Sequence, residues 1–246
     1  MDNWSLIGLL ASSVALLVSW YGFQARPSAW RDRLAGQPPL LVGAARLFYF
    51  IGLPYLAILL GLLSTQQFGL TGLEYLALVN PEGSNLIVQI YQTTSLLLLA
   101  WLLDSGTTLL VGGLALLFVA LLRWGLAQQR VEISTTAPTF LPVLYQAVHW
   151  AFYRALCWAI TQDFYLGVVL GGLVALLEMG LIDLVQGRQP LDHAGFLHQA
   201  LLLSLTATVF YFSPNLWLLL PIHWALAALI PFGWPKRLAS QASPTG

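Results

Sequence analysis

The sequence predicts an all-α fold, a polytopic transmembrane helix bundle in one integral membrane domain. Of the 246 residues, 58% are hydrophobic and only 8% are charged, whereas soluble domains carry about 25% charged residues. The mean hydropathy is +0.76. Residues 4–23 and 107–122 are apolar over nearly the ~20 residues that a helix needs to cross a bilayer. With so few charges the chain has no solvated surface, so its solvent must be lipid.

About eight spans are expected from the apolar runs and the polar linkers between them. Pro54 should kink the second span, and the Asp104-Ser105-Gly106 segment should form a tight turn that makes the third and fourth spans antiparallel neighbours. The apolar piece 68–79 is too short to cross and is expected to lie at the interface or to re-enter. The expected spans are 4–23, 41–63, 86–103, 107–122, 140–161, 164–186, 196–212 and 216–232.

The spans divide into N-terminal helices and linkers over 1–139, a four-helix core over 140–232 and a polar tail over 233–246. An even number of spans puts both termini on one side. More basic residues then share the side of the termini than lie opposite, which predicts that both termini face the cytoplasm. The two sets are Arg123, Arg130, Arg188, Lys236 and Arg237 against Arg26, Arg31 and Arg33.

Several ionisable residues fall inside the expected spans, where charge is costly and usually faces the bundle interior. Arg46 and Asp183 lie near span ends, so their side chains should reach the interface. His149 and Arg154 are five residues apart, which separates them by about 140° around a helix. Glu178 lies well inside its span and needs a partner or a proton. We expect a buried polar cluster that joins Glu178 to Arg154 or to a histidine, His149 or His223.

Two stretches, 148-VHWAFYRALCW-158 and 214-PNLWLLLPIHWALAAL-229, resemble the CAAX protease and bacteriocin-processing (Abi) family of intramembrane proteases. The first motif of that family is Glu-Glu-x-x-x-Arg, followed by Phe-x-x-x-His and a C-terminal His-x-x-x-Asn. Arg154 matches the arginine of the first motif and His223 the histidine of the third. Glu178 stands at the histidine of the second. The departures are at the glutamate pair, replaced by His149 and Trp150, and at the asparagine, replaced by Ala227.

The resemblance implies a bacterial plasma-membrane protein on a protease-like scaffold. In that family the two glutamates are taken to activate water, so their loss removes the general base. We therefore expect a non-catalytic pseudoenzyme that acts as a subunit, adaptor or assembly factor of a membrane complex. The alternative is an active intramembrane peptidase with a rearranged site, in which Glu178 is the base and His149, Arg154 and His223 assist.

The expected partners are the lipid bilayer and other membrane protein subunits. The net charge of zero gives no electrostatic case for nucleic acid. No cofactor is predicted. Zinc stays open as a metal bound by His149, Glu178 and His223, and haem or a chlorophyll-type pigment stays open as a cofactor bound by one of the histidines. These are His149, His193, His198 and His223.

Overall fold

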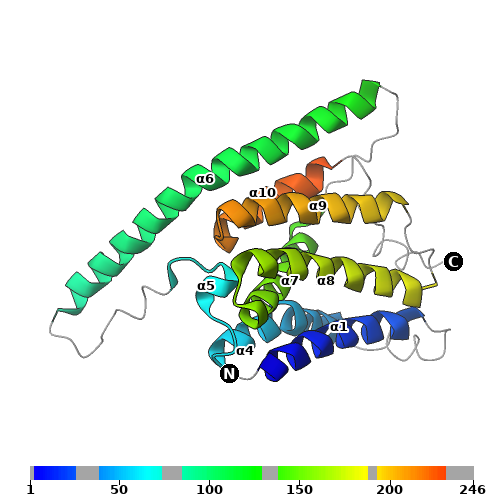
Figure 1. The fold of residues 1–246 in the computed structure, drawn as a ribbon, viewed down its shortest axis with the longest axis horizontal. Helices are drawn as coiled ribbons and strands as arrows, with labels where there is room; N and C mark the ends of the chain where they lie inside the picture. The colour runs from blue at the N-terminus through cyan, green and yellow to red at the C-terminus, as the bar shows by residue number, and fades with distance from the viewer. Residues whose placement is uncertain (1–2, 26–38, 74–84, 129–137, 188–192, 231–246) are drawn as a thin grey trace.

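The structure is a computed structural model that describes residues 3–25, 39–73, 85–128, 138–187 and 193–230 (Figure 1). Every regular element in these ranges is helical, so the prediction of an all-α fold is confirmed. Five helical segments are long and apolar enough to cross a membrane, which supports a membrane protein but not the expected eight spans. They are Asn3–Gly22, Val42–Leu59, Leu86–Gln128, Phe164–Val185 and Gly195–Phe212.

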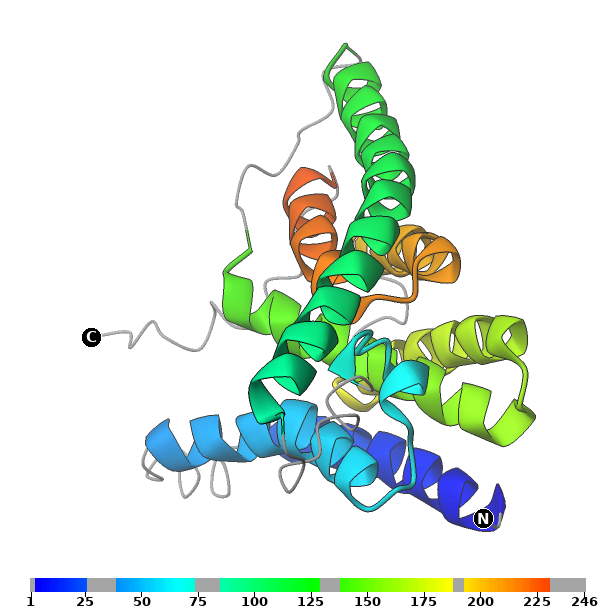
Figure 2. The same ribbon diagram turned by 90° about the vertical axis from the view of Figure 1, so that its left-hand side faces the viewer.

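Five helices form the body of the bundle, with α7 in its interior (Figures 1 and 2). They are α1 (Asn3–Ala25), α7 (Phe140–Thr161), α8 (Phe164–Val185), α9 (His193–Phe212) and α10 (Leu216–Leu229). The observed bounds agree with those expected to within three residues, and the largest differences are at the start of α9 and at the end of α10. Helix α7 is contacted by α1, α8 and α10, and an unbroken run from Ala147 to Cys157 is buried. A helix that is buried all round and carries polar groups can be positioned only by the helices that enclose it.

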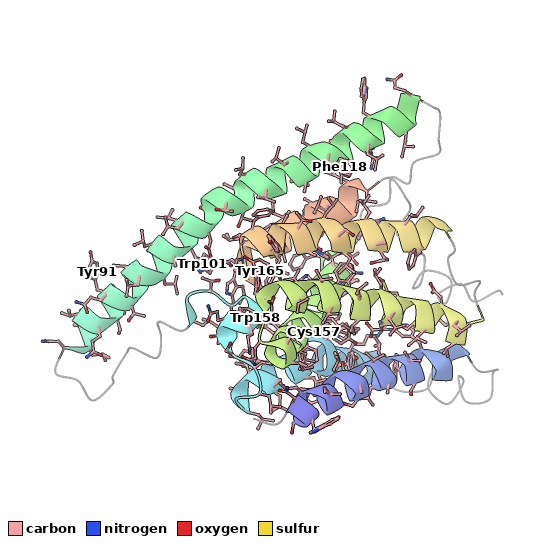
Figure 3. The ribbon with its side chains drawn as sticks, in the orientation of Figure 1. Tyr91, Trp101, Phe118, Cys157, Trp158 and Tyr165 are labelled. Atoms are coloured by element: carbon pink, nitrogen blue, oxygen red, sulfur yellow. The ribbon has the colours of Figure 1, made fainter. Side chains whose placement is uncertain are left out.

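Small residues allow α8 to approach α7 closely. A Cβ atom added to Gly167 would lie 2.6 Å from Cα of Trp158, and one added to Gly171 would lie 2.6 Å from Cα of Arg154. Ala175, one turn further along, is fully buried. Small residues four apart form a stripe that lets two helix backbones meet, and this stripe fixes the antiparallel register of α7 and α8. Figure 3 shows Trp158 where the two helices meet.

The second expected span is a composite helix with a π-helical segment just before Pro54. It consists of α3 (Pro39–Leu47), the π-helix η1 (Phe48–Gly52) and α4 (Leu53–Leu59). Pro54 has no N–H and its ring excludes the normal bond to Phe50, so the chain widens into a π-turn just before it. The Leu53 N–H donates to the Phe48 carbonyl, five residues back. The sequence therefore located an irregularity of the helix correctly at Pro54, and the structure shows that this irregularity includes a π-helix.

A short compact segment follows and covers one end of the bundle. Helix α5 (Thr65–Phe68) has a capping box made by Ser64 and Gln67 and ends at Gly69 in the left-handed region, with φ of +79°. The Leu216 N–H donates to the Gly69 carbonyl at 2.7 Å, which ties the segment to the start of α10. Non-helical backbone is tolerated near a membrane when protein satisfies it in this way. Residues 74–79 of the expected interfacial piece lie outside the described ranges.

The largest departure from the sequence prediction is α6 (Leu86–Gln128), a continuous helix of 43 residues. The expected turn at Asp104-Ser105-Gly106 is wrong. Ser105 Oγ donates to the Leu102 carbonyl at 2.8 Å and Thr108 Oγ1 to the Asp104 carbonyl at 2.8 Å. Such back-bonds satisfy hydroxyl groups without ending a helix.

The other polar side chains near the expected turn form tertiary contacts with the α9–α10 connection. The Asp104 carboxylate accepts a bond from Asn215 Nδ2 at 3.0 Å, and the hydroxyl oxygens of Thr108 and Ser213 lie within hydrogen-bonding distance at 2.7 Å. The α9–α10 connection therefore binds the middle of α6. The polar signal at 104–108 comes from this contact, and a single sequence cannot tell it from a turn.

Because α6 joins two of the expected spans into one helix, the number of spans is no longer the even number from which the orientation was predicted. The prediction that both termini face the cytoplasm thus loses its structural basis. The side of the membrane on which each end lies stays a prediction of the basic-residue distribution alone.

Replacing Gly171 with alanine tests the close α7–α8 contact. The added methyl would overlap the Arg154 backbone, so we expect a loss of about 1–3 kcal/mol in the free energy of unfolding. Thermal unfolding in mild detergent measures the effect. Gly172→Ala is the matched control, because its nearest neighbour would be Cδ2 of Leu203 at 4.0 Å. Equal stability of the two variants would contradict the close approach.

Candidate functional site

The buried carboxylate of Glu178 is held by two side chains from α7. His149 Nε2 lies 3.2 Å from Oε1 and 3.3 Å from Oε2 of Glu178, and the Tyr153 hydroxyl donates to Oε1 at 2.9 Å. All three side chains are buried. His149 and Tyr153 are four residues apart, so they lie on one face of α7. The expected pairing of Glu178 with a histidine is therefore present, and the histidine is His149.

Aromatic side chains of η1 pack against His149 at the edge of the cluster. The His149 ring lies 5.4 Å from the Tyr49 ring and 5.2 Å from the Phe50 ring. The Tyr49 hydroxyl in turn donates to the Ser13 carbonyl on α1 at 2.7 Å. Because π-turns are frequent at functional sites, the placement of η1 against His149 marks this cluster as the first candidate site. Its chemistry is that of a buried histidine and carboxylate that can share a proton.

A second polar group lies on the other side of α7. Arg154 is 2% exposed, and its guanidinium carbon lies 4.3 Å from the centroid of the Phe210 ring. His223 packs edge-on against Trp150, with ring centroids 5.3 Å apart. Arg154 and His198 both lie close enough to His223 to interact with it electrostatically. Arg154, His198 and His223 thus form a cationic cluster, named here the Arg154 cluster.

The four candidate catalytic residues consequently fall into two separate pairs. His149 and Glu178 are on the face of α7 toward α8 and η1, and Arg154 and His223 are on the face toward α9 and α10. This division follows from the helical rotation of about 140° that separates residues five apart. The structure does not bring Glu178 and His223 to one common centre.

The other ionisable candidates behave less uniformly. Asp183 is 7% exposed, so the expectation that it reaches the interface is wrong. Arg46, in the last turn of α3, is half-buried. The single cysteine, Cys157, is free and buried. His193 begins α9, but its side chain lies outside the described part of the structure. Within the described ranges, no three His, Cys, Asp or Glu side chains are grouped to hold a metal ion.

Sequence reasoning missed several residues of both clusters. Tyr153, which matches the aromatic of the first motif, was not named as a candidate, although its spacing of four from His149 placed its hydroxyl on the same helix face. His198 was named only as a possible cofactor ligand, and nothing in the sequence linked it to Arg154 or His223. Tyr49 and Ser13 come from distant helices, and no signal in the sequence links them to Glu178.

Comparison with known proteins gives no further assignment. No protein-family model, curated protein or solved structure matches the chain. The class defined by fold and site is therefore a helical membrane protein with two buried polar clusters. The resemblance to CAAX proteases stays a hypothesis that depends on Arg154, His223 and their apolar surroundings.

Removal of the Tyr153 hydroxyl tests the hydrogen bonding around Glu178. Tyr153→Phe leaves the buried carboxylate without one donor, which should cost about 1–3 kcal/mol in the free energy of unfolding. Thermal unfolding in detergent reports the loss. The exposed Tyr91 of α6, visible in Figure 3, provides the control Tyr91→Phe, which should change stability little. If Tyr153→Phe did not change the unfolding temperature, the hydrogen bond to Glu178 would contribute no stability.

Proposed function

We propose that the chain is a non-catalytic integral membrane protein that serves as a subunit, adaptor or assembly factor of a membrane complex. Its scaffold is proposed to be that of a divergent CAAX-protease-like protein in a bacterial plasma membrane. The observation that carries the proposal is α6, because its apolar surface is longer than a bilayer can cover. The argument for a missing catalytic centre is separate and comes second.

Helix α6 exceeds the membrane in length. Its 43 residues correspond to about 64 Å at 1.5 Å per residue, whereas the hydrocarbon core is about 30 Å thick and the headgroups extend it to about 45 Å. Even a tilt of about 40° leaves roughly 49 Å along the membrane normal. Part of α6 must therefore lie outside the hydrocarbon or be covered by protein.

The excess length is at the N-terminal half. Near Asp104, α6 contacts the α9–α10 connection, and Trp101 Nε1 donates to the Thr71 carbonyl at 3.0 Å. Beyond this level the N-terminal half of α6 projects past the end of the bundle, toward the left in Figure 1. The projecting half is rich in exposed apolar side chains, among them Ile87, Tyr91, Leu98 and Leu102.

These four side chains share one face of the helix. Their positions fall within about 60° of helical rotation at 100° per residue, so they lie along one side of the helix, named here the α6 stripe. Large exposed apolar patches usually mark protein or membrane interaction sites. Since the bilayer cannot cover all of α6, an apolar segment of another membrane protein is the proposed occupant of the stripe.

The polar clusters support a non-catalytic role. Both carboxylate oxygens of Glu178 lie within hydrogen-bonding distance of His149, and Trp150, which cannot accept a proton, faces His223. A general base must reach the proton that it removes. The rearranged peptidase would need Glu178 and His223 to act on one substrate, and they lie on different faces of α7.

Truncation of the α6 stripe tests the proposal. Leu98 and Leu102 are 54% and 69% exposed. The double variant Leu98→Ala, Leu102→Ala should lower the yield of co-purifying membrane proteins about tenfold, which corresponds to a loss of about 1.4 kcal/mol of binding. Quantitative mass spectrometry of the protein purified from its native membrane in mild detergent gives the yield.

The control is the double variant Leu177→Ala, Leu184→Ala on α8, where both side chains are 60% exposed. It removes the same atoms from an outward face that the bilayer can cover, so partner yield should stay unchanged. Partner loss in both variants, or in neither, would contradict a specific role of the α6 stripe.

The peptidase alternative makes a different prediction. If the chain cleaves peptides in the membrane, Glu178→Ala and His223→Ala should each abolish processing of a substrate that accumulates in those strains. We expect no such product difference. Comparison of membrane peptides from the wild-type strain and the two mutant strains decides between the two functions.

A further inference from the structure

The guanidinium of Arg154 is buried without a hydrogen-bond acceptor among the described residues. Its Nε, Nη1 and Nη2 atoms all lack one, although the side chain is only 2% exposed. Buried cations normally occur paired, because an uncompensated charge at membrane depth is costly. The arginine therefore presents its full set of donors to an acceptor that the described residues do not supply.

His223 presents a further polar atom beside Arg154. The His223 side chain is 1% exposed, its Nε2 atom has no hydrogen-bond partner within the described ranges, and it interacts electrostatically with Arg154. Phe210 under the guanidinium and Trp150 beside the His223 ring hold the two side chains in place. A planar guanidinium fixed on an aromatic ring has the geometry that binds a carboxylate or phosphate in a bidentate manner.

None of the acidic residues in the described ranges is hydrogen-bonded to the Arg154 guanidinium. Glu178 is occupied by His149 and Tyr153. Asp104 accepts from Asn215, and Asp163 accepts from the Leu166 N–H at the start of α8. Asp183 lies near the end of α8 and, like these, forms no hydrogen bond or ion pair with Arg154. A bound ligand is therefore the candidate source of the negative charge that would pair with Arg154.

An apolar groove lies beside this part of the bundle, lined by neighbours of the residues that contact Arg154. It lies between α8 and α9, has a volume of about 370 Å³, and is lined by Val168, Gly172, Leu203, Ala207 and Tyr211, among others. Val168 and Gly172 flank the α8 segment centred on Gly171, which contacts the Arg154 backbone. Ala207 is one turn from Phe210, the residue under the guanidinium. The groove thus brings an apolar chain close to the cluster.

We propose that Arg154 and His223 bind the oxyanion group of an amphiphilic molecule, a carboxylate or a phosphate, whose apolar tail lies in the α8–α9 groove. The anion neutralises the charge of the buried guanidinium, and the apolar tail fills the α8–α9 groove. This inference is independent of the partner interaction at the α6 stripe. It assigns no chemical reaction to the cluster.

The test uses the full-length protein after extensive exchange into a neutral detergent. Palmitic acid and hexadecyl phosphate should each raise its unfolding temperature by about 5–10 °C near saturation. Methyl palmitate, which has the same tail without the charge, and inorganic phosphate, which has the charge without the tail, should leave the temperature unchanged. Because this comparison uses only the wild-type protein, it does not depend on the folding of any variant.

Arg154→Met gives the second arm, because methionine replaces the side chain with an apolar one. Palmitic acid and hexadecyl phosphate should no longer raise the unfolding temperature of this variant. The control is Arg123→Met, which should keep the effect of both compounds. Among the described residues, Arg123 donates only to the Leu229 carbonyl, at 3.4 Å. Stabilisation by inorganic phosphate alone, or equal stabilisation by methyl palmitate, would overturn the proposal. So would a wild-type protein that responds to none of the four compounds.

Discussion

The close antiparallel contact between α7 and α8 is the constraint on which the interior of the bundle depends. With glycine at 167 and 171, the two backbones meet near Trp158 and Arg154. Because the helices run antiparallel, each step along α8 corresponds to a step back along α7. The register set by these glycines carries Glu178 to the level of His149 and Tyr153, where its carboxylate is hydrogen-bonded. A wider helix separation would leave a charged group in an apolar interior, which is costly.

The position of α7 explains how one helix serves two polar clusters. Every residue from Ala147 to Cys157 is buried, so polar side chains on any face of this segment meet protein rather than lipid. His149 and Tyr153 meet α8 and η1, while Trp150 and Arg154, again four residues apart, meet α9 and α10. Residues four apart lie on the same face of the helix. His149 and Arg154 are five apart and therefore lie on different faces.

The sequence predicted what depends on local pattern and missed what depends on long-range contacts. Apolar length predicted the helices from 140 onward nearly to the residue, and helical rotation predicted that His149 and Arg154 diverge. The Asp104-Ser105-Gly106 turn failed because hydroxyl back-bonds and Asn215, more than a hundred residues away, satisfy the same polar groups. Likewise Tyr49 reaches His149 through a π-turn that Pro54 causes, and a proline alone does not distinguish a kink from a π-turn.

The two buried clusters differ in the charge that they leave uncompensated. At Glu178 the carboxylate lies within hydrogen-bonding distance of His149 and accepts a bond from the Tyr153 hydroxyl, although Nδ1 of His149 is buried without a partner among the described residues. At Arg154 a guanidinium meets an aromatic face and histidines, and cation–π attraction is worth far less than the hydration that burial removes. The carboxylate of the first cluster is therefore paired across α7 and α8, which suits a structural role. The second is incomplete as it stands, and an anion from outside the described chain would balance it with the same bidentate geometry that arginine offers to carboxylates and phosphates.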